Sequence, residues 1–174
     1  DNIRFLLITG VSKFAKVSIF SDLNHLVDLT LHPNYAALCG YTQAELEHHF
    51  EPYLRTMPAN TLENMKAWYD GYSWDGKTFL YNPFSVLNFF DQKIFGNFWF
   101  STGTPSFLVK LMRKRNEYKL QETVVSNLVF ESFILEKFDD LDLNSLLLQT
   151  GYLTIKSKLP VDRLLLDYPN QEVR

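Results

Sequence analysis

Apolar residues between positions 42 and 57 recur at the spacing of an α-helix. Thr42 to Glu45 is a capping-box sequence, in which each side chain satisfies a backbone N–H group at a helix start. The apolar positions that follow are separated by four, three, one and three residues, which predicts a single amphipathic helix. These positions are Leu46, Phe50, Tyr53, Leu54 and Met57.

Three further segments combine a helix start with apolar residues at helical spacing. Segment 60–70 begins at an asparagine and carries apolar residues on one helical face. Asn82 and Pro83 supply a cap and a first-turn proline for the next helix. Thr104 and Pro105 repeat this arrangement. The middle of the chain is therefore predicted to be helical.

Strand patterns lie at the two ends of the chain. Residues 3–10 form a continuous apolar run that ends in Thr-Gly, which is typical of a buried strand in a parallel sheet. Near the other end, a short helix over 144–150 is stopped by Gly151 and is followed by strands over 152–156 and 163–168. The order helix, glycine, strand, turn, strand resembles the end of a winged helix-turn-helix, a module that binds DNA in some proteins and only packs in others. We predict an α+β fold that is mainly helical.

The stretch from Gly71 to Thr78 matches the phosphate-loop pattern G-x-x-x-x-G-K-[ST]. In that motif backbone N–H groups cradle phosphates, the lysine reaches the outer phosphates, and a buried strand and a helix flank the loop. Here a predicted helix precedes the loop and β-prone residues follow Lys77. The sequence favours an aromatic-flanked turn that reverses at Asp75 and Gly76. A nucleotide-binding enzyme that uses this loop remains an alternative.

Composition narrows the class of protein. The net charge is −3 over 174 residues, so the chain as a whole shows no electrostatic preference for nucleic acid or an anionic membrane. The single cysteine, Cys39, excludes an internal disulfide, fits a reducing cytosol and is interpreted as a small buried hydrophobe. No apolar run approaches the roughly 18 residues that span a bilayer. The chain begins at Asp1 without a methionine and ends at Arg174, which indicates a fragment.

Basic residues gather near the end of the helix that Thr104 is predicted to start. A basic helix end complements the partial negative charge of the helix C-terminus. The same residues could instead contact a phosphate backbone, and both interpretations stay open. The residues concerned are Lys110, Arg113, Lys114 and Arg115.

No metal site is predicted. His48 and His49 are neighbours, and neighbouring helical side chains point about 100° apart, so the pair cannot chelate one ion as an i, i+4 pair does. We interpret both histidines as part of a solvated helix face.

Seven short motifs follow one another along the chain: FLLITGVSKF (5–14), DLTL (28–31), CGYT (39–42), WYDGY (68–72), YNPFSVL (81–87), TGTPSFL (102–108) and LDYPNQEVR (166–174). Taken in order, they resemble the C-terminal part of an uncharacterised AAA-ATPase-like family that is common in gut bacteria. The resemblance covers nearly the whole chain, and the ordered set is specific although each motif alone is weak. Members of that family often carry a PD-(D/E)XK nuclease-like domain downstream.

The resemblance implies a division of the chain into three parts. Residues 1–40 would be the last strand and exit loop of an ATPase αβ core, 41–120 a helical lid, and 121–174 a winged-helix-like part that leads into a linker. The phosphate and magnesium ligands would lie upstream, so ATP and Mg²⁺ would belong to the full-length parent and no cofactor is expected here. Sensor-like residues near the nucleotide would be Thr9, Ser12 and Lys13, and either Pro83 or Pro105 would lie near adenine.

The main hypothesis is therefore a cytoplasmic fragment that couples nucleotide state to an effector domain and has no catalytic residues of its own. Its partners would be the upstream ATPase core and the downstream nuclease-like domain, with no membrane contact. The first alternative is a nucleic-acid-binding winged-helix module, and the second is the enzyme that would use Gly71 to Thr78.

Overall fold

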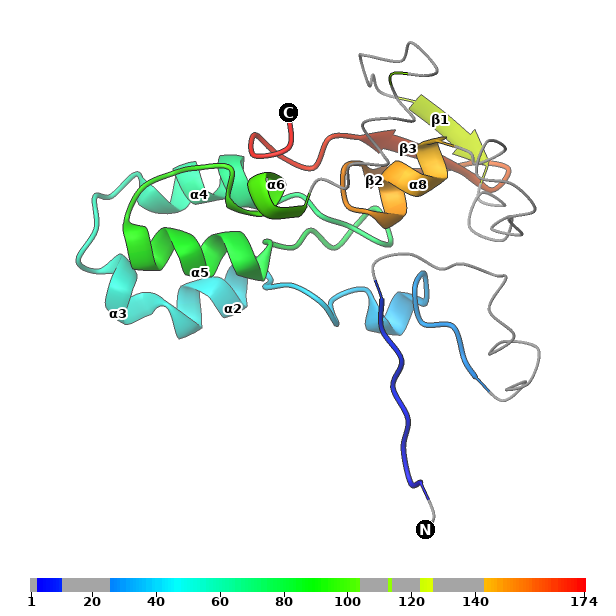
Figure 1. Ribbon diagram of the computed structural model, residues 1–174, viewed down its shortest axis with the longest axis horizontal. Coiled ribbons are helices and arrows are strands. Elements are labelled where there is room, and N and C mark those ends of the chain that lie inside the picture. Colours follow the sequence, from blue (N-terminus) through cyan, green and yellow to red (C-terminus); the bar gives the residue numbers. More distant parts are fainter. Residues whose placement is uncertain (1–2, 11–25, 104–112, 114–122, 127–142) are drawn as a thin grey trace.

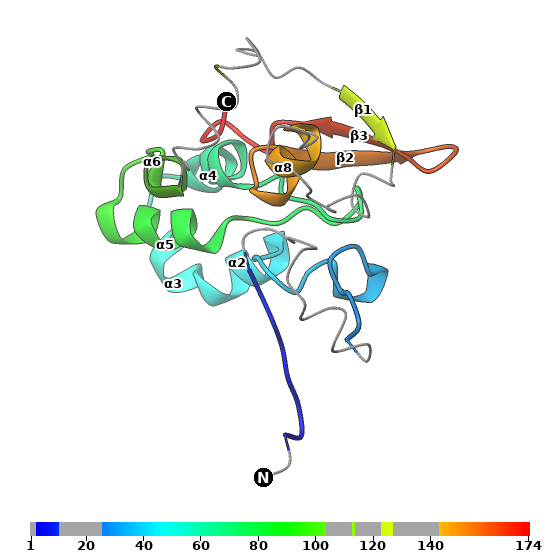
Figure 2. The same cartoon turned by 45° about the vertical axis from the view of Figure 1, so that its right-hand side comes forward.

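The computed structural model describes residues 3–10, 26–103, 113, 123–126 and 143–174. The fold is α+β and mainly helical, as predicted, with a helical part and a small antiparallel sheet covered by one helix (Figure 1). A short 3-10 helix, η1 (Pro33–Tyr35), precedes the helical part. Residues 3–10 run away from both parts in Figures 1 and 2.

The amphipathic segment that begins at Thr42 forms two helices rather than one. The capping box is present, since the Glu45 N–H donates to Thr42 Oγ1 over 3.3 Å and the Thr42 N–H donates to Glu45 Oε2 over 2.9 Å. Helix α2 (Gln43–His49) ends with Phe50 as its C-cap, and α3 (Glu51–Leu54) follows with Pro52 in its first turn. Proline has no N–H and its ring clashes with the carbonyl four residues back, so Pro52 interrupts the predicted helix.

Helices α4 (Thr61–Tyr69), α5 (Pro83–Gln92) and α6 (Phe98–Gly103) complete the helical part. The predicted cap of α5 is confirmed, because Asn82 Oδ1 accepts from the N–H groups of Phe84 and Ser85. Aromatic rings dominate the packing; the rings of Phe50 and Phe90 are stacked with their centroids 4.6 Å apart. The buried core comprises Leu46, Met65, Tyr69, Tyr81, Val86, Phe89 and Phe90.

A second core lies between the sheet and α8 (Leu143–Gln149). Strands β1 (Thr123–Ser126), β2 (Thr154–Leu159) and β3 (Arg163–Asp167) are antiparallel in the order β1-β3-β2. The predicted helix, glycine stop and two strands are confirmed near their expected positions. Gly151 adopts a φ of 84° after α8, and the Tyr152 N–H returns to the Leu147 carbonyl over 2.8 Å.

The prediction that residues 3–10 form a buried strand is wrong for the chain as described. The segment belongs to no sheet, and its side chains face solvent, with Ile3 79%, Phe5 80% and Leu7 57% exposed. Thr9 lies on this exposed segment. An apolar run forms a parallel strand only when neighbouring strands accept its hydrogen bonds and cover both faces. None of the described residues supplies those neighbours.

Two connections hold the sheet against the helices. The loop after α4 meets β2, where the Ser73 N–H donates to Thr154 Oγ1 over 2.7 Å and the Ile155 N–H donates to the Ser73 carbonyl over 3.4 Å. The segment after β3 returns to α4, where the Gln171 N–H donates to the Ala67 carbonyl over 3.0 Å. The sheet and the helices therefore meet where residues 68–73 and 168–174 lie together.

Candidate functional site

The loop from Gly71 to Thr78 has a turn geometry rather than a phosphate-loop geometry. The loop follows helix α4, and its residue Tyr72 pairs with Leu80 in an antiparallel bridge. No helix begins at Lys77. A Cβ atom placed on Gly76 would lie 2.9 Å from the Ser157 Cα, so the loop packs directly on β2. The strand and helix that orient phosphate-binding N–H groups are both absent from this loop.

The Asp75 carboxylate already occupies the N–H groups that a phosphate would need. Asp75 Oδ1 accepts from the Lys77 N–H over 2.8 Å and from the Thr78 N–H over 2.7 Å. The Gly76 N–H donates to Ser73 Oγ over 2.9 Å. Partial burial acts to raise the pKa of Asp75, but the hydrogen bonds from Thr78, Lys77 and Ser73 outweigh it and lower that pKa. The Asp75 carboxylate is therefore the anion that these backbone N–H groups bind.

Glu172 is the central acid of the junction between helices and sheet. It is 1% exposed, and its carboxylate accepts from Ser85 Oγ over 2.7 Å and from the Trp99 N–H over 2.6 Å. Trp99 is in the first turn of α6, where free N–H groups favour a negative charge. Burial raises the pKa of Glu172, while the hydrogen bonds from Ser85, Trp99 and Phe100 act against that rise. One side chain thus joins the C-terminal segment to both α5 and α6.

A second polar contact lies beside Gly71, where two chain segments pass very close together. Gly71 has a φ of 109°, and an added Cβ would stand 2.2 Å from the Pro169 carbonyl oxygen. The same carbonyl accepts from Lys156 Nζ over 3.2 Å. Burial raises the pKa of Asp70 and lowers the pKa of Lys156, and each charge partly offsets the shift of the other.

Several buried polar atoms at this junction have no well-formed hydrogen bond among the described residues: Asp70 Oδ1, the Tyr72 hydroxyl and both ends of the Asn170 amide. The Tyr72 hydroxyl lies near the amides of Asn82 and Asn170, and burial raises its pKa. Buried polar groups without partners are costly, at roughly 1–3 kcal/mol each. The junction is therefore polar and incompletely satisfied, unlike the two apolar cores that it connects.

We name this polar junction by its residues: Asp70, Tyr72, Ser85, Lys156, Asn170 and Glu172. Sequence reasoning did not single any of them out as site residues. One feature of the sequence could have pointed to these residues. All of them except Lys156 lie in three of the motifs that carry the family resemblance, namely 68–72, 81–87 and 166–174. The structure shows that these three motifs meet in space.

The site residues predicted from the sequence are not brought together by the described part of the chain. Thr9 is exposed on the segment that leaves the fold, whereas Pro83 is the first residue of α5, next to the junction. Arg113 is exposed. Cys39 is also exposed, which corrects the expectation that it is buried. Outside the described residues lie Ser12, Lys13, Pro105, Lys110, Lys114 and Arg115.

The described residues contain no group of three or more His, Cys, Asp or Glu side chains that could hold a metal ion. His48 and His49 are exposed at the end of α2, as predicted. None of the helices in the described part of the chain has the length and apolar character to cross a membrane.

The chain is similar to a protein of Azotobacter chroococcum mcd 1 that is described as an uncharacterized protein in the vnfD 5' region. The two are 39% identical over 178 aligned positions, which cover 99% of this chain and 33% of the relative. The chain thus spans about a third of the length of the curated relative that it matches. No family model and no solved structure matches the chain.

Proposed function

We propose that this chain is the regulatory part of a AAA-ATPase-like protein, in which a helical lid and a winged-helix-like part pass nucleotide state to an effector domain. The observation that carries the proposal is the polar junction. There Glu172, five residues after β3, binds α5 through Ser85 and α6 through the Trp99 N–H. A movement of the helices would therefore pull directly on the segment that follows the sheet.

The exposed segment at residues 3–10 supports a role inside a longer protein. Its large apolar side chains are 49–80% exposed, and the relative is about three times as long as the region matched. In the proposal, an upstream ATPase core pairs with this segment and supplies the phosphate and magnesium ligands for ATP. A PD-(D/E)XK nuclease-like domain lies downstream, and the whole protein works in the cytoplasm. The chain alone does not hydrolyse ATP.

A nucleic-acid-binding module is the second candidate, favoured by the sheet. The order β1-β3-β2, with α8 directly before the β2–β3 hairpin, is the order expected of a winged helix, and Lys158 and Arg163 are exposed on that hairpin. Against it, α8 carries no lysine or arginine and buries most of its residues. A helix that reads DNA needs a basic, exposed face. The module is therefore better suited to packing than to DNA binding.

Hydrogen exchange with and without ATP tests the main proposal in the longer parent protein. ATP should change amide exchange at residues 67–72 and 168–174, and Glu172→Gln should remove that response while ATP affinity stays within about twofold. Glu63→Gln, on the exposed face of α4, is the matched control and should keep the response. Unchanged exchange at the junction in the wild-type protein would rule out coupling through it.

Binding experiments on the isolated chain distinguish the main proposal from an ATP-binding enzyme and from a DNA-binding module. Filter binding of labelled ATP should be weak and identical for wild type and Lys77→Ala, because Asp75 occupies the loop's N–H groups. Lys77-dependent tight binding, or ATP hydrolysis by the chain alone, would contradict the proposal. Duplex DNA binding that grows steeply as salt is lowered would favour the second candidate instead.

A further inference from the structure

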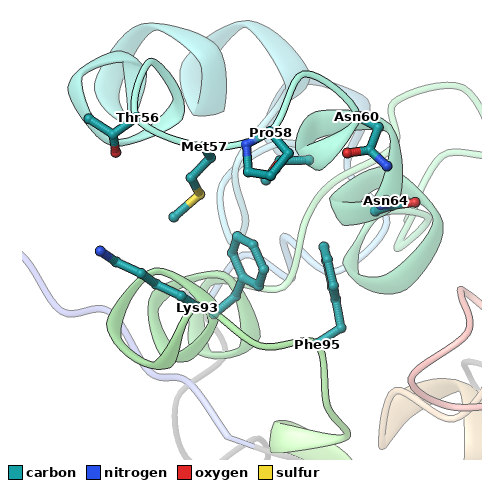
Figure 3. A pocket seen from close by; sticks show the side chains of 9 residues that line it. Thr56, Met57, Pro58, Asn60, Asn64, Lys93 and Phe95 are labelled. Atoms are coloured by element: carbon teal, nitrogen blue, oxygen red, sulfur yellow. The ribbon is translucent and has the colours of Figure 1, made fainter.

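The cavity in the helical part and the buried polar atoms without hydrogen bonds lie in different places. The cavity has a volume of about 290 Å³ and lies between the ends of α3, α4 and α5 (Figure 3). None of the residues that line it carries one of the buried, unpartnered side-chain atoms found in the described part of the chain. Three of those atoms belong instead to Tyr72 and Asn170, at the polar junction.

The main chain at Asn170 is held from both sides. The preceding Pro169 carbonyl accepts from Lys156 Nζ over 3.2 Å. The following Gln171 N–H donates to the Ala67 carbonyl over 3.0 Å. Between these two contacts, the oxygen and the nitrogen of the Asn170 amide are both buried, and neither makes a hydrogen bond to the described residues. The fold therefore fixes this amide where both of its ends need a partner.

The Tyr72 hydroxyl, which lies beside this amide, is also fixed in position. The Tyr72 N–H donates to the Leu80 carbonyl over 3.2 Å, and the Tyr72 carbonyl accepts from the Leu80 N–H over 2.8 Å. The Tyr72 ring meets the Trp99 ring edge to face, with centroids 6.4 Å apart. Burial raises the pKa of Tyr72, so the hydroxyl keeps its proton at neutral pH and acts as a donor.

The neighbouring side chains cannot satisfy all of these groups. Asn82 also lies beside the Tyr72 hydroxyl, but its Oδ1 already accepts from the N–H groups of Phe84 and Ser85, which use both lone pairs of an amide oxygen. Asn170 could accept the Tyr72 proton through its own oxygen. The two ends of a primary amide point in different directions, so one hydroxyl bonds only one of them. The other end of the Asn170 amide then still lacks a partner.

We propose that the polar junction holds an internal water molecule, bound by the Asn170 amide and the Tyr72 hydroxyl. Water both donates and accepts, and internal waters usually make about three hydrogen bonds to buried polar groups. A cation is less suitable, because the amide also presents donors and the Lys156 ammonium group lies next to Asn170, on the Pro169 carbonyl. The water joins the C-terminal segment to the loop after α4. The site is independent of the proposed function, because it follows from hydrogen bonds within this chain.

Oxygen-17 relaxation dispersion of the 174-residue chain tests the proposal, because it counts long-lived bound waters through their oxygen atoms. Asn170→Leu keeps a similar side-chain size and removes both polar ends, so it should hold about one long-lived water fewer than wild type. Asn88→Leu is the matched control. Asn88 is exposed on α5, and its Nδ2 donates to the Phe84 carbonyl over 2.8 Å, so this variant should keep the wild-type count. Equal counts for wild type and Asn170→Leu would overturn the proposal.

Proton NMR then locates the water and covers the case in which Asn170→Leu does not fold. The side-chain NH₂ protons of Asn170 should show cross-relaxation with water, with the sign that a bound water gives. Tyr72→Phe removes the hydroxyl proton, which could otherwise transfer the signal by exchange with solvent. The cross-relaxation should persist in this variant, because the buried amide still needs a partner. A signal that is absent in wild type, or that disappears with the Tyr72 hydroxyl, would contradict the proposal.

Discussion

Gly71 is the residue at which the junction tolerates no side chain. Its φ of 109° is a conformation that residues with a Cβ rarely adopt, and the Pro169 carbonyl oxygen is 2.2 Å from where that atom would stand. The contact is with backbone, which cannot rotate away. The same short stretch holds Asp70 and Tyr72, whose polar atoms are incompletely satisfied. Glycine here fixes how closely the C-terminal segment can approach α4.

Gly71→Ala should destabilise the chain by roughly 3 kcal/mol, since it adds backbone strain and a clash that separates the two segments. Urea unfolding monitored by tryptophan fluorescence measures the loss. Gly96→Ala is the control, because Gly96 has no left-handed φ and its nearest contacts would be Phe98 ring atoms at 3.7 Å. Equal losses for the two variants would show that the close approach at Pro169 has no energetic role.

Glu172 makes the stability of the chain depend on pH. Burial raises its pKa in the folded state, so the folded chain holds this proton more tightly than the unfolded chain does. The resulting stabilisation is complete below the ordinary glutamate pKa and is lost as the pH rises through the raised value. Glu172→Gln removes that titration. Denaturation between about pH 4 and pH 7 should therefore show wild type losing stability relative to Glu172→Gln as the pH rises.

The control for this titration is Glu63→Gln, which changes an exposed glutamate on α4. Its stability should run parallel to that of wild type across the same pH range. A Glu172→Gln profile that also runs parallel to wild type would contradict the pKa shift assigned to Glu172.

At the scale of elements, the loop between α4 and α5 is organised by Asp75. Its carboxylate binds two backbone N–H groups and the Thr78 hydroxyl, the last over 2.9 Å. Ser73 then joins the loop to β2. A side chain that closes its own turn in this way stabilises local structure in the manner of a helix cap. The loop thereby presents a fixed surface to the sheet.

Asp75→Ala should cost about 1–3 kcal/mol, because it leaves the partly buried N–H group of Thr78 and its neighbour without an acceptor. Chemical denaturation of the isolated chain measures this loss. Asp91→Ala, at an exposed position on α5, should change stability by less than about 0.5 kcal/mol. A loss for Asp75→Ala no larger than that of Asp91→Ala would show that the turn does not depend on the carboxylate.

Local signals in the sequence predicted the elements that depend on local chemistry. The Asn82 cap, the Thr42 capping box and the Gly151 stop are each set by neighbouring residues, and each is confirmed. The sequence did not predict β1, because its four residues are defined by pairing with β3 about forty positions away. The polar junction was missed for the same reason, since Ser85 and Glu172 lie 87 positions apart.

At the scale of the whole molecule, the described chain has two covered cores and one uncovered apolar segment. Both cores are closed by their own helices or strands. Residues 3–10 are different, because five large apolar side chains there are 49–80% exposed. Exposed apolar groups of this extent mark an interaction surface or a site of self-association. The proposed function makes the segment a strand of an upstream core, so its behaviour should differ between the isolated chain and the longer parent.

Leu7→Lys tests this difference. In the isolated chain it should reduce self-association in sedimentation experiments and leave the melting temperature unchanged, because Leu7 is 57% exposed and belongs to neither core cluster of the described residues. In the longer parent it should instead lower stability and ATP binding, because a lysine is then buried in a sheet at a cost of several kcal/mol. Thr9→Lys adds the same charge without removing an apolar side chain, so it should leave self-association closer to wild type in the isolated chain. A parent protein that tolerates Leu7→Lys as well as the isolated chain does would show that residues 3–10 are not part of a buried sheet.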